Sequence, residues 1–292
     1  MKSMKKTLFL MAVALVAAAC TSSDDEVIEI KTKRVKFSIE GDFSMVQSLF
    51  NEDTRSTALT DAENTMTDLW IFDFVGDECV QSLHQSVDDD GWGQPSLTLT
   101  YGIHHLYFVA SRGSDPTVNT TAKTIVWGTP RDTFWKDYAI SVDGTTGNQS
   151  VELDRVAMKL KVTITDEIPD GTATISLTPS TWFYGINYTT GAPAGSRDNV
   201  ERSVNVPANY IGTSGSLSMS IFGFSSVTEW NTDVDVAVKN AGGDVLGSAT
   251  ISNAPIKRNM VTSYQGRLFT SPESVMMITL NDDWLDERLG TW

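Results

Sequence analysis

The sequence predicts an all-β protein, and three observations support this prediction. Apolar and polar residues alternate with a period of two in many short segments, as in Val35-Lys36-Phe37-Ser38-Ile39. Glycine, aspartate and asparagine, which are typical of tight turns, separate these segments. Beyond the N-terminal 19 residues, no window of a dozen or more residues shows the periodicity of an amphipathic helix. Together these patterns are typical of β-sandwiches.

The first 19 residues have the pattern of an export signal. Three lysines precede an apolar run from Leu8 to Val16, and residues 17–20 read Ala-Ala-Ala-Cys. The apolar run is too short to span a bilayer as a permanent helix. A cysteine directly after small residues resembles the lipobox of bacterial lipoproteins, in which the thiol is acylated and begins the mature chain. We therefore expect a lipoprotein signal peptide over 1–19 and a lipid on Cys20; the alternative is an ordinary signal peptide with a cysteine nearby by chance.

The remaining elements follow in order along the chain. Residues 20–33 are polar and without a pattern, as in a flexible tether. Strands are expected at 35–39, 69–75, 97–101, 105–109, 124–127, 151–165, 173–177, 234–238, 245–251, 260–269 and 275–280, and one short helical turn at 131–137. This number of strands favours two sandwiches over one. We place an N-terminal domain at 34–153 and a C-terminal domain at 154–292, because the turn-rich stretch 143–149 gives way there to a long strand.

Composition limits the partners and the chemistry. The chain has 22 basic and 37 acidic residues and a net charge of −15, which disfavours nucleic acid and anionic lipid headgroups as partners. Membrane contact is therefore expected through the lipid and not through a basic surface. Cys20 and Cys79 are the only cysteines, so acylation of Cys20 would leave Cys79 without a disulfide partner. Because Cys79 follows Asp77-Glu78, and nearby acids raise the pKa of a thiol, we expect a packing residue and not a nucleophile.

Motifs for catalysis or for cofactor binding are not found in the sequence. It contains no Gly-x-Ser-x-Gly, no phosphate-binding loop and no His-Glu-x-x-His. Residues Asp88-Asp89-Asp90-Gly91 resemble the start of a calcium loop, but Leu99 stands where the bidentate glutamate would be. His104 and His105 are adjacent on an expected strand, so their side chains should point to opposite faces and cannot share a metal easily. We expect no catalytic, metal-binding or cofactor-binding residues.

Several segments, spread in order along nearly the whole mature chain, resemble those of a known family. They are the lipobox and acidic tail at Cys20, Thr54-Arg55-Ser56, 69–73, 153–160, 165–169, 256–262 with 266–269, and Asp282-Asp283-Trp284. Together they resemble the fimbrillin superfamily, the lipoprotein pilins of Gram-negative gut and oral anaerobes. Within it, the nearest likeness is to the fimbrial subunit family that includes the fimbrium anchor proteins. The resemblance implies two transthyretin-like β-sandwiches in tandem.

The resemblance also implies a mode of assembly. In polymerising members, a trypsin-like protease cuts after an arginine in the loop that follows the first strand; that strand is lost, and a neighbour's C-terminal segment fills the groove. By this resemblance Arg55 would be the cleavage site, Ser56 the new N-terminus, and Val35, Phe37 and Ile39 the apolar residues of the displaced strand. Anchor members keep their lipid and first strand. The alternative is therefore that Arg55 is an ordinary loop arginine that is never cut.

The last expected strand, 275–280, allows two interpretations. It could be donated to the next subunit, or it could be the final strand of its own domain. The acidic residues directly after it leave little tail to donate, which favours its own domain.

We therefore expect a non-enzymatic, lipid-anchored anchor or accessory subunit of a surface fimbrium at the outer membrane, supporting adhesion. Its partners would be other fimbrial subunits, the outer membrane through Cys20, and a host receptor or glycan. The main alternative is a surface glycan-binding lipoprotein that uses Trp92, Trp135, Trp182 and Trp230, which lie in or near expected loops. A third alternative, a hydrolase, would need a cleft carboxylate with a strongly raised pKa, and no such feature is evident in the sequence.

Overall fold

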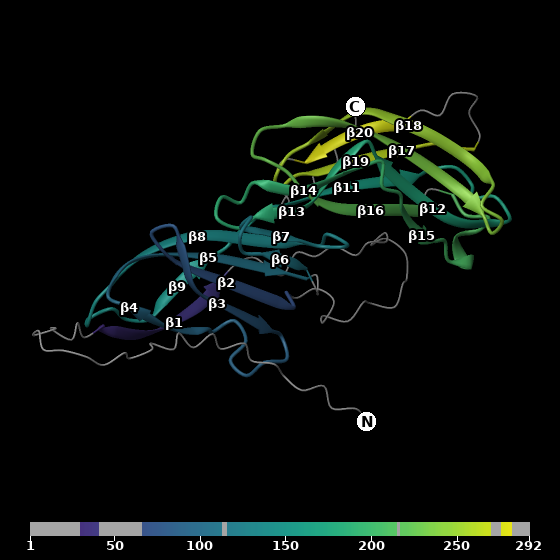
Figure 1. Ribbon diagram of the computed structural model, residues 1–292. Helices are drawn as coiled ribbons and strands as arrows, with labels where there is room; N and C mark the ends of the chain where they lie inside the picture. The colour runs from purple at the N-terminus through teal and green to yellow at the C-terminus, as the bar shows by residue number, and fades with distance from the viewer. Residues whose placement is uncertain (1–29, 41–65, 113–115, 215–216, 270–275, 282–292) are drawn as a thin grey trace, which may run out of the picture. The chain divides into compact units, whose positions relative to one another are not determined.

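A computed structural model describes residues 30–40, 66–112, 116–214, 217–269 and 276–281 (Figure 1). Nearly all of these residues lie in strands or in the turns between them, which confirms the all-β prediction. The helical element among them is one 3-10 turn, η2, at Ala208–Tyr210. Within the described ranges, no helix is long and apolar enough to cross a membrane. The expected signal peptide and most of the tether at 20–33 lie outside these ranges.

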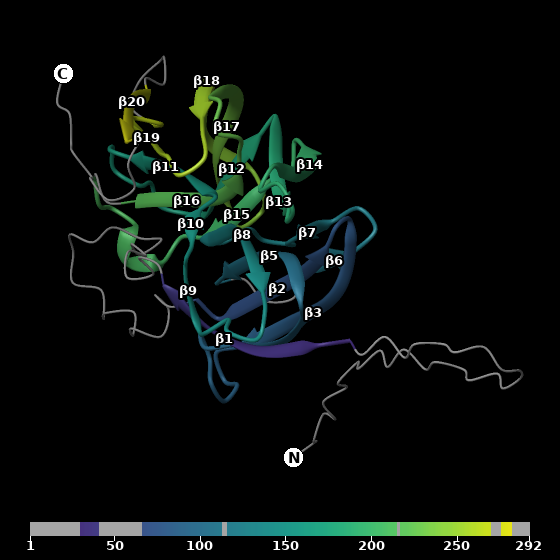
Figure 2. The ribbon, with the colours of Figure 1, turned by 90° about the vertical axis from the view of Figure 1, so that its left-hand side faces the viewer.

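The described strands form five sheets (Figures 1 and 2). In the first two, the orders are β4-β1-β9 and β10-β8-β5-β2-β3. Their bounds are β1 Thr32–Glu40, β2 Asp68–Val75, β3 Glu78–Ser86, β4 Ser96–Thr100, β5 Gly102–Ser111, β8 Thr133–Val142, β9 Gln149–Glu152 and β10 Asp154–Arg155.

The other three sheets have four strands each, in the orders β14-β13-β7-β6, β15-β12-β17-β18 and β16-β11-β19-β20. Their bounds are β6 Thr117–Asn119, β7 Thr124–Val126, β11 Ala157–Ile164, β12 Thr172–Pro179, β13 Thr181–Asn187, β14 Pro193–Asp198, β15 Arg202–Asn205, β16 Leu217–Phe224, β17 Trp230–Asn240, β18 Val245–Ile256, β19 Val261–Gly266 and β20 Met276–Asn281.

Three clusters of buried side chains fill the space between the sheets. One contains Phe37 of β1 together with residues of β2, β4, β5, β8 and β9. A second is built from β11, β12, β16 and β17, with Leu160 as a fully buried member. The third joins aromatic residues that are distant in sequence, and in it the rings of Phe72 and Tyr188 stack at 3.9 Å. Apolar burial in these clusters is the main stabilising contribution to the fold.

Pairing across the expected domain boundary is a feature that the sequence did not predict. β6 and β7 precede residue 153, yet β7 pairs with β13, which follows it, and the two strands share a sheet with β14. The division into 34–153 and 154–292 therefore stays a prediction.

The helical turn expected at 131–137 is wrong. Residues from Thr133 onward belong to β8, which pairs antiparallel with β5 on one side and with β10 on the other. A strand with neighbours on both edges satisfies its backbone N–H and C=O groups through those neighbours, and this tertiary pairing overrides a weak local pattern.

Candidate functional site

The site residues expected from the sequence divide into two groups. Cys20, Arg55 and Ser56 lie outside the described residues. Val35, Phe37 and Ile39 lie on β1, the strand that the resemblance marks for displacement. The geometry of β1 and of its surroundings, which we call the β1 slot, is therefore the part of the expected site that the structure describes.

β1 is the middle strand of its sheet, with β4 antiparallel on one edge and β9 parallel on the other (Figures 1 and 2). The backbone N–H of Phe37 donates to the carbonyl of Pro95 at 2.9 Å, and that of Ile39 donates to the carbonyl of Gly93 at 3.0 Å. At the end of the strand, the N–H of Leu153 donates to the carbonyl of Glu40 at 3.0 Å. Removal of β1 would therefore expose unpaired backbone groups on both walls of the slot.

The apolar face of β1 fills the slot with a row of alternate side chains. Val35 and Phe37 are fully buried, and Ile39 is half-buried against the same cluster. The ring of Phe37 lies 5.6 Å from that of Phe108 and 6.4 Å from that of Tyr138, the latter edge-on. Such a row of alternate pockets is the arrangement that gives specificity when a sheet accepts an added strand.

Polar side chains of β1 also make contacts at the surface. Lys33 Nζ donates to the carbonyl of Gly144 at 3.0 Å, and Arg34 Nε donates to Ser96 Oγ at 2.9 Å. Ser150 Oγ donates to Glu40 Oε1 at 2.5 Å. Exposed contacts of this kind contribute little to stability. The backbone bonds and the buried side chains are therefore the main restraints on β1.

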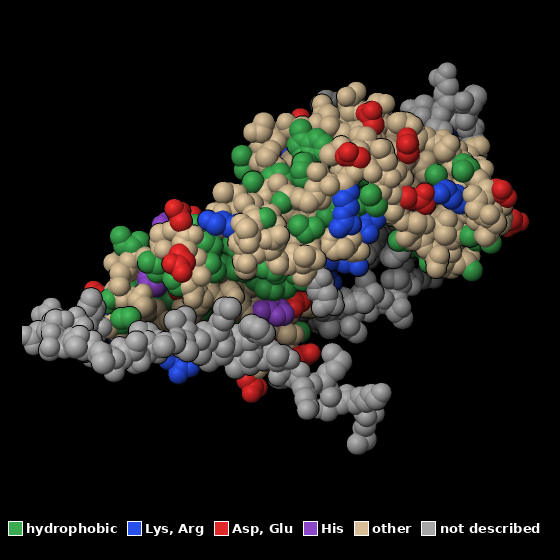
Figure 3. Space-filling view, in the orientation of Figure 1, with side chains coloured by type: hydrophobic (Ala, Val, Ile, Leu, Met, Phe, Trp, Pro, Cys, Tyr) green, Lys and Arg blue, Asp and Glu red, His purple; other side chains and the backbone are tan. Residues whose placement is uncertain are grey.

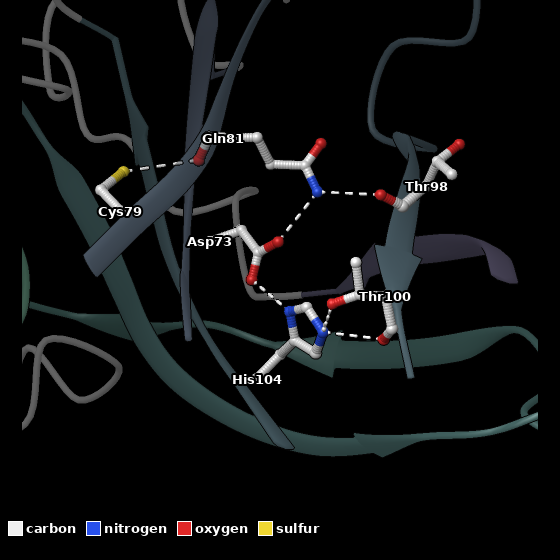
Figure 4. A network of polar contacts seen from close by, with 6 residues as sticks. All are labelled: Asp73, Cys79, Gln81, Thr98, Thr100 and His104. Atoms are coloured by element: carbon white, nitrogen blue, oxygen red, sulfur yellow. Dashed lines mark hydrogen bonds and ion pairs between the residues drawn. The ribbon is translucent and has the colours of Figure 1, made fainter. Parts of the chain in front are cut away.

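A buried polar network lies behind β4 (Figure 4). The carboxylate of Asp73 on β2 is fully buried; its Oδ1 lies 2.7 Å from His104 Nδ1 of β5, and its Oδ2 accepts from Gln81 Nε2 of β3 at 2.8 Å. Gln81 Nε2 also donates to the carbonyl of Thr98 at 3.1 Å, and His104 Nε2 lies 2.9 Å from the carbonyl of Thr100. The network thus joins three strands of one sheet to β4 of another.

The ring of His104 has partners on both sides. Nδ1 lies 2.7 Å from Asp73 Oδ1, and Nε2 lies 3.2 Å from the hydroxyl and 2.9 Å from the carbonyl of Thr100. Both ring nitrogens of the buried His104 are therefore satisfied, and its closest partner is Asp73. Loss of either partner would leave the other buried without its strongest bond, which costs about 3–5 kcal/mol when the remaining group is charged.

The network forms hydrogen bonds with backbone carbonyls on the edge of β4 that faces away from β1. Carbonyls of alternate residues in a strand point to opposite edges, and Phe37 of β1 bonds Pro95, so the carbonyls of Thr98 and Thr100 lie on the far edge. Among the described strands, β4 has β1 as its only ladder partner. Gln81 and His104 therefore hold β4 in place independently of β1.

Cys79 lies beside this network and behaves as the sequence predicted, for a different reason. Its thiol is half-buried, and Sγ lies 3.5 Å from the carbonyl of Gln81 (Figure 4). Burial raises the pKa of the Cys79 thiol, and the negative charge of Asp73 raises it further. The acid that matters is thus Asp73 and not the neighbouring Asp77 or Glu78.

Two of the four tryptophans expected in or near loops lie within strands, close to their starts. Trp182 lies in β13, is 1% exposed and donates its indole N–H to the carbonyl of Phe222 at 2.9 Å. Trp135 lies in β8, and its N–H donates to the carbonyl of Tyr188 at 2.7 Å. Both are strand residues whose bulk fills space between sheets. Trp92 packs against the buried cluster that contains Phe37, and Trp230 begins β17.

Among the described residues, no group of three His, Cys, Asp or Glu side chains is placed so that it could bind one metal ion. His104 is buried, and His105 is about half exposed with Nδ1 3.3 Å from Asp137 Oδ1, so their opposite orientation is confirmed. In the acidic turn, Asp89 Oδ2 accepts from the backbone N–H of Ser86 at 2.8 Å.

The last expected strand lies in its own sheet. β20 pairs antiparallel with β19, with Met276 opposite Gly266 and Asn281 opposite Val261. The stretch thus extends a sheet of its own chain, the arrangement that the sequence favours, and whether it is also donated to another subunit stays a prediction. Its other edge has no ladder partner among the described strands.

Comparisons with known proteins agree with this architecture. Residues 117–291 match the model of a family of unknown function, DUF6562; the match begins with β6 and leaves β1 to β5 outside it. No curated protein matches the sequence.

The chain is also similar to solved structures. It shares 11% identity and a TM-score of 0.52 with a candidate polysaccharide-binding protein from Bacteroides thetaiotaomicron, over 85% of this chain and 96% of that chain. With a candidate adhesin from Bacteroides ovatus, the values are 9% and 0.51, over 81% and 88%. With the fimbrial anchor protein Mfa2 from Porphyromonas gingivalis, they are 9% and 0.50, over 86% and 98%. The expected likeness to fimbrial proteins is therefore confirmed at the level of the fold.

Proposed function

The chain belongs to the family of unknown function DUF6562, and we propose that it is a lipid-anchored structural subunit of a cell-surface fimbrium. It would occupy an anchor or accessory position, assemble by β-strand complementation and support adhesion without enzymatic activity. Cys20 would carry the lipid that holds it at the outer membrane. Its partners would be other fimbrial subunits and a host receptor or glycan.

The observation that carries the proposal is the construction of the β1 slot. β1 is flanked on both edges, and its two fully buried side chains point into a preformed apolar row. A strand of similar alternation from another subunit could make the same backbone bonds and fill the same pockets. Because Gln81 and His104 hold β4 from behind, one wall of the slot would persist while the strands exchange.

The segment between β1 and β2 fits this proposal. Arg55 and Ser56 lie between Glu40, the end of β1, and Asp68, the start of β2. Cleavage after Arg55 would separate β1 from the rest of the chain and make its release irreversible. An uncut chain would keep β1 on the lipid tether, as anchor members do by the resemblance.

The charge of the chain is consistent with these partners and not with nucleic acid. Acidic side chains are spread over the face drawn in Figure 3, with Lys and Arg side chains among them. The net charge of −15 would repel a phosphate backbone.

A reversible lock on β1 tests the proposal. Lys36 and Ser96 are exposed partners in the β1–β4 register, next to the Phe37–Pro95 hydrogen bond, so they form a pair without ladder bonds of its own. The Cα atoms of such a pair lie about 4.5 Å apart, a separation that a disulfide can bridge. The double variant K36C/S96C should therefore join β1 to β4 under oxidising conditions.

We expect the oxidised variant to lose its co-isolation with other fimbrial subunits from washed outer membranes, and the reduced variant to regain it. The single variant K36C, which cannot form the lock, serves as the matched control. Equal co-isolation of the oxidised and reduced forms would overturn complementation at the β1 slot. Absence of fimbrial subunits from all preparations would overturn the fimbrial role itself.

A further inference from the structure

A second concave site lies at the starts of β13, β14 and β17. None of its residues belongs to the strands of the β1 slot. Its volume is about 530 Å³. Pockets for small ligands typically have about 300–1,000 Å³ and combine an apolar lining with a few polar groups. The residues that line it are Ser180, Thr181, Phe183, Pro193, Ser226, Thr228, Glu229, Trp230 and Asn231.

The apolar part of the lining is held in a fixed orientation. The rings of Trp230 and Phe183 meet edge to face, 5.8 Å apart at 86°. The indole N–H of Trp230 donates to Ser225 Oγ at 2.8 Å, which prevents the ring from turning. Both rings are half-buried, so part of each remains accessible. Pro193 adds a third apolar ring to the lining.

The polar part of the lining contains side chains without a partner of their own. Thr181 Oγ1 already donates to Asp198 Oδ1, and Ser226 Oγ donates to the carbonyl of Thr228. Glu229 and Asn231 are exposed, and neither side chain has a hydrogen bond or an ion pair within the described ranges. A carboxylate and an amide on either side of Trp230 in sequence are thus available to a ligand.

We propose that this pocket binds a neutral sugar unit of an oligosaccharide. The C–H face of a pyranose ring is apolar and packs on aromatic rings, while its hydroxyls donate to carboxylates and exchange hydrogen bonds with amides. No Lys or Arg lines the pocket, Glu229 contributes a negative charge, and the chain is acidic overall. A sugar that carries a carboxylate or sulfate would therefore be repelled. The site goes beyond fimbrial assembly, because none of its residues belongs to the β1 slot.

Saturation-transfer NMR on the full chain tests this inference. The probes are maltotetraose, mannotetraose and chitotetraose, with tetragalacturonate as the acidic comparison. We expect transfer to at least one neutral probe, with a Kd of about 1 mM, as for a single shallow site. The double variant E229A/N231A should weaken that binding about tenfold or more, which corresponds to the loss of more than about 1 kcal/mol.

Two controls keep the result interpretable. The variant E78A/N205A removes an exposed glutamate and an exposed asparagine elsewhere and should leave binding unchanged. The variant W230F keeps an aromatic ring at the core edge but loses the indole, so weaker binding in a chain that melts normally would place the sugar on Trp230. No transfer to any neutral probe, unchanged binding by E229A/N231A, or equal binding of tetragalacturonate would overturn the inference.

Discussion

Truncation of Phe37 to alanine is the perturbation that probes the β1 slot most strongly. The side chain is fully buried and packs on Phe108 and Tyr138, so its loss leaves a cavity between two sheets. Substitution of a buried phenylalanine by alanine costs about 3–5 kcal/mol. The neighbouring Ser38 is exposed on the opposite face of the same strand, and Ser38→Ala should change the free energy of unfolding by less than about 0.5 kcal/mol.

The effect of this destabilisation on hydrogen exchange depends on whether β1 can open while the rest of the chain stays folded. If it can, the amides of Phe37 and Ile39, which bond the carbonyls of Pro95 and Gly93, become exposed without unfolding of the rest. Phe37→Ala should then accelerate the hydrogen exchange of these amides by a factor of about 10² to 10³·⁵, because each tenfold change corresponds to about 1.4 kcal/mol. Amides of β11, which lies in another buried cluster, should remain better protected than those of β1, because their exchange requires unfolding of the rest of the chain.

Hydrogen exchange followed by mass spectrometry, together with urea unfolding, measures both quantities. The reasoning fails if Phe37→Ala destabilises the chain by less than about 1 kcal/mol, or if Ser38→Ala does as much damage. It also fails if β1 and β11 are equally protected before and after the substitution. In that case β1 would open only with global unfolding and could not serve as an exchangeable strand.

Three further predictions concern the surroundings of the slot. His104→Ala leaves the buried carboxyl of Asp73 without its ring partner and should cost about 3–5 kcal/mol in urea unfolding, whereas a loss below about 1 kcal/mol would contradict the clamp on β4. Burial raises the pKa of Tyr188 from 10 to about 12, so the stability that this phenol contributes is present below pH 10 and is lost as the pH rises through about 12. Tyr188→Phe, which removes a hydroxyl without a partner among the described residues, should make the alkaline fall in melting temperature shallower, and an identical profile would contradict this. The raised thiol pKa of Cys79 should slow its reaction with iodoacetamide relative to the urea-unfolded chain, and equal rates in the two states would contradict the burial of this thiol.

The strands with strong periodicity could be predicted from the sequence, because their pattern reports burial directly. Val35 and Phe37 alternate with polar residues and are buried, and the apolar run at 69–75 forms the inner strand β2. β3 was missed, because its alternation mixes cysteine, leucine and valine with polar residues on both faces. Its strand character comes from pairing with β2 along its whole length, which is a tertiary effect.

The polar network could not be predicted for a similar reason. Asp73 stands inside an apolar run, where a single acid gives no indication of a partner. Gln81 lies across the β2–β3 turn and His104 lies farther along the chain on β5, and only the register of β2 with these two strands brings both within hydrogen-bond distance of Asp73. Trp182 was expected in or near a loop, whereas it lies in β13 and its N–H satisfies a carbonyl inside the fold.

The most direct test of a lipid-anchored fimbrial subunit is the intact mass and N-terminal mapping of the protein from washed outer membranes. We predict a mature chain that begins at acylated Cys20 and co-isolates with fimbrial subunits. A chain that begins at Ser56 without lipid would contradict the anchor role and show a polymerising subunit activated at Arg55. A terminus at any other residue would remove the case for Arg55.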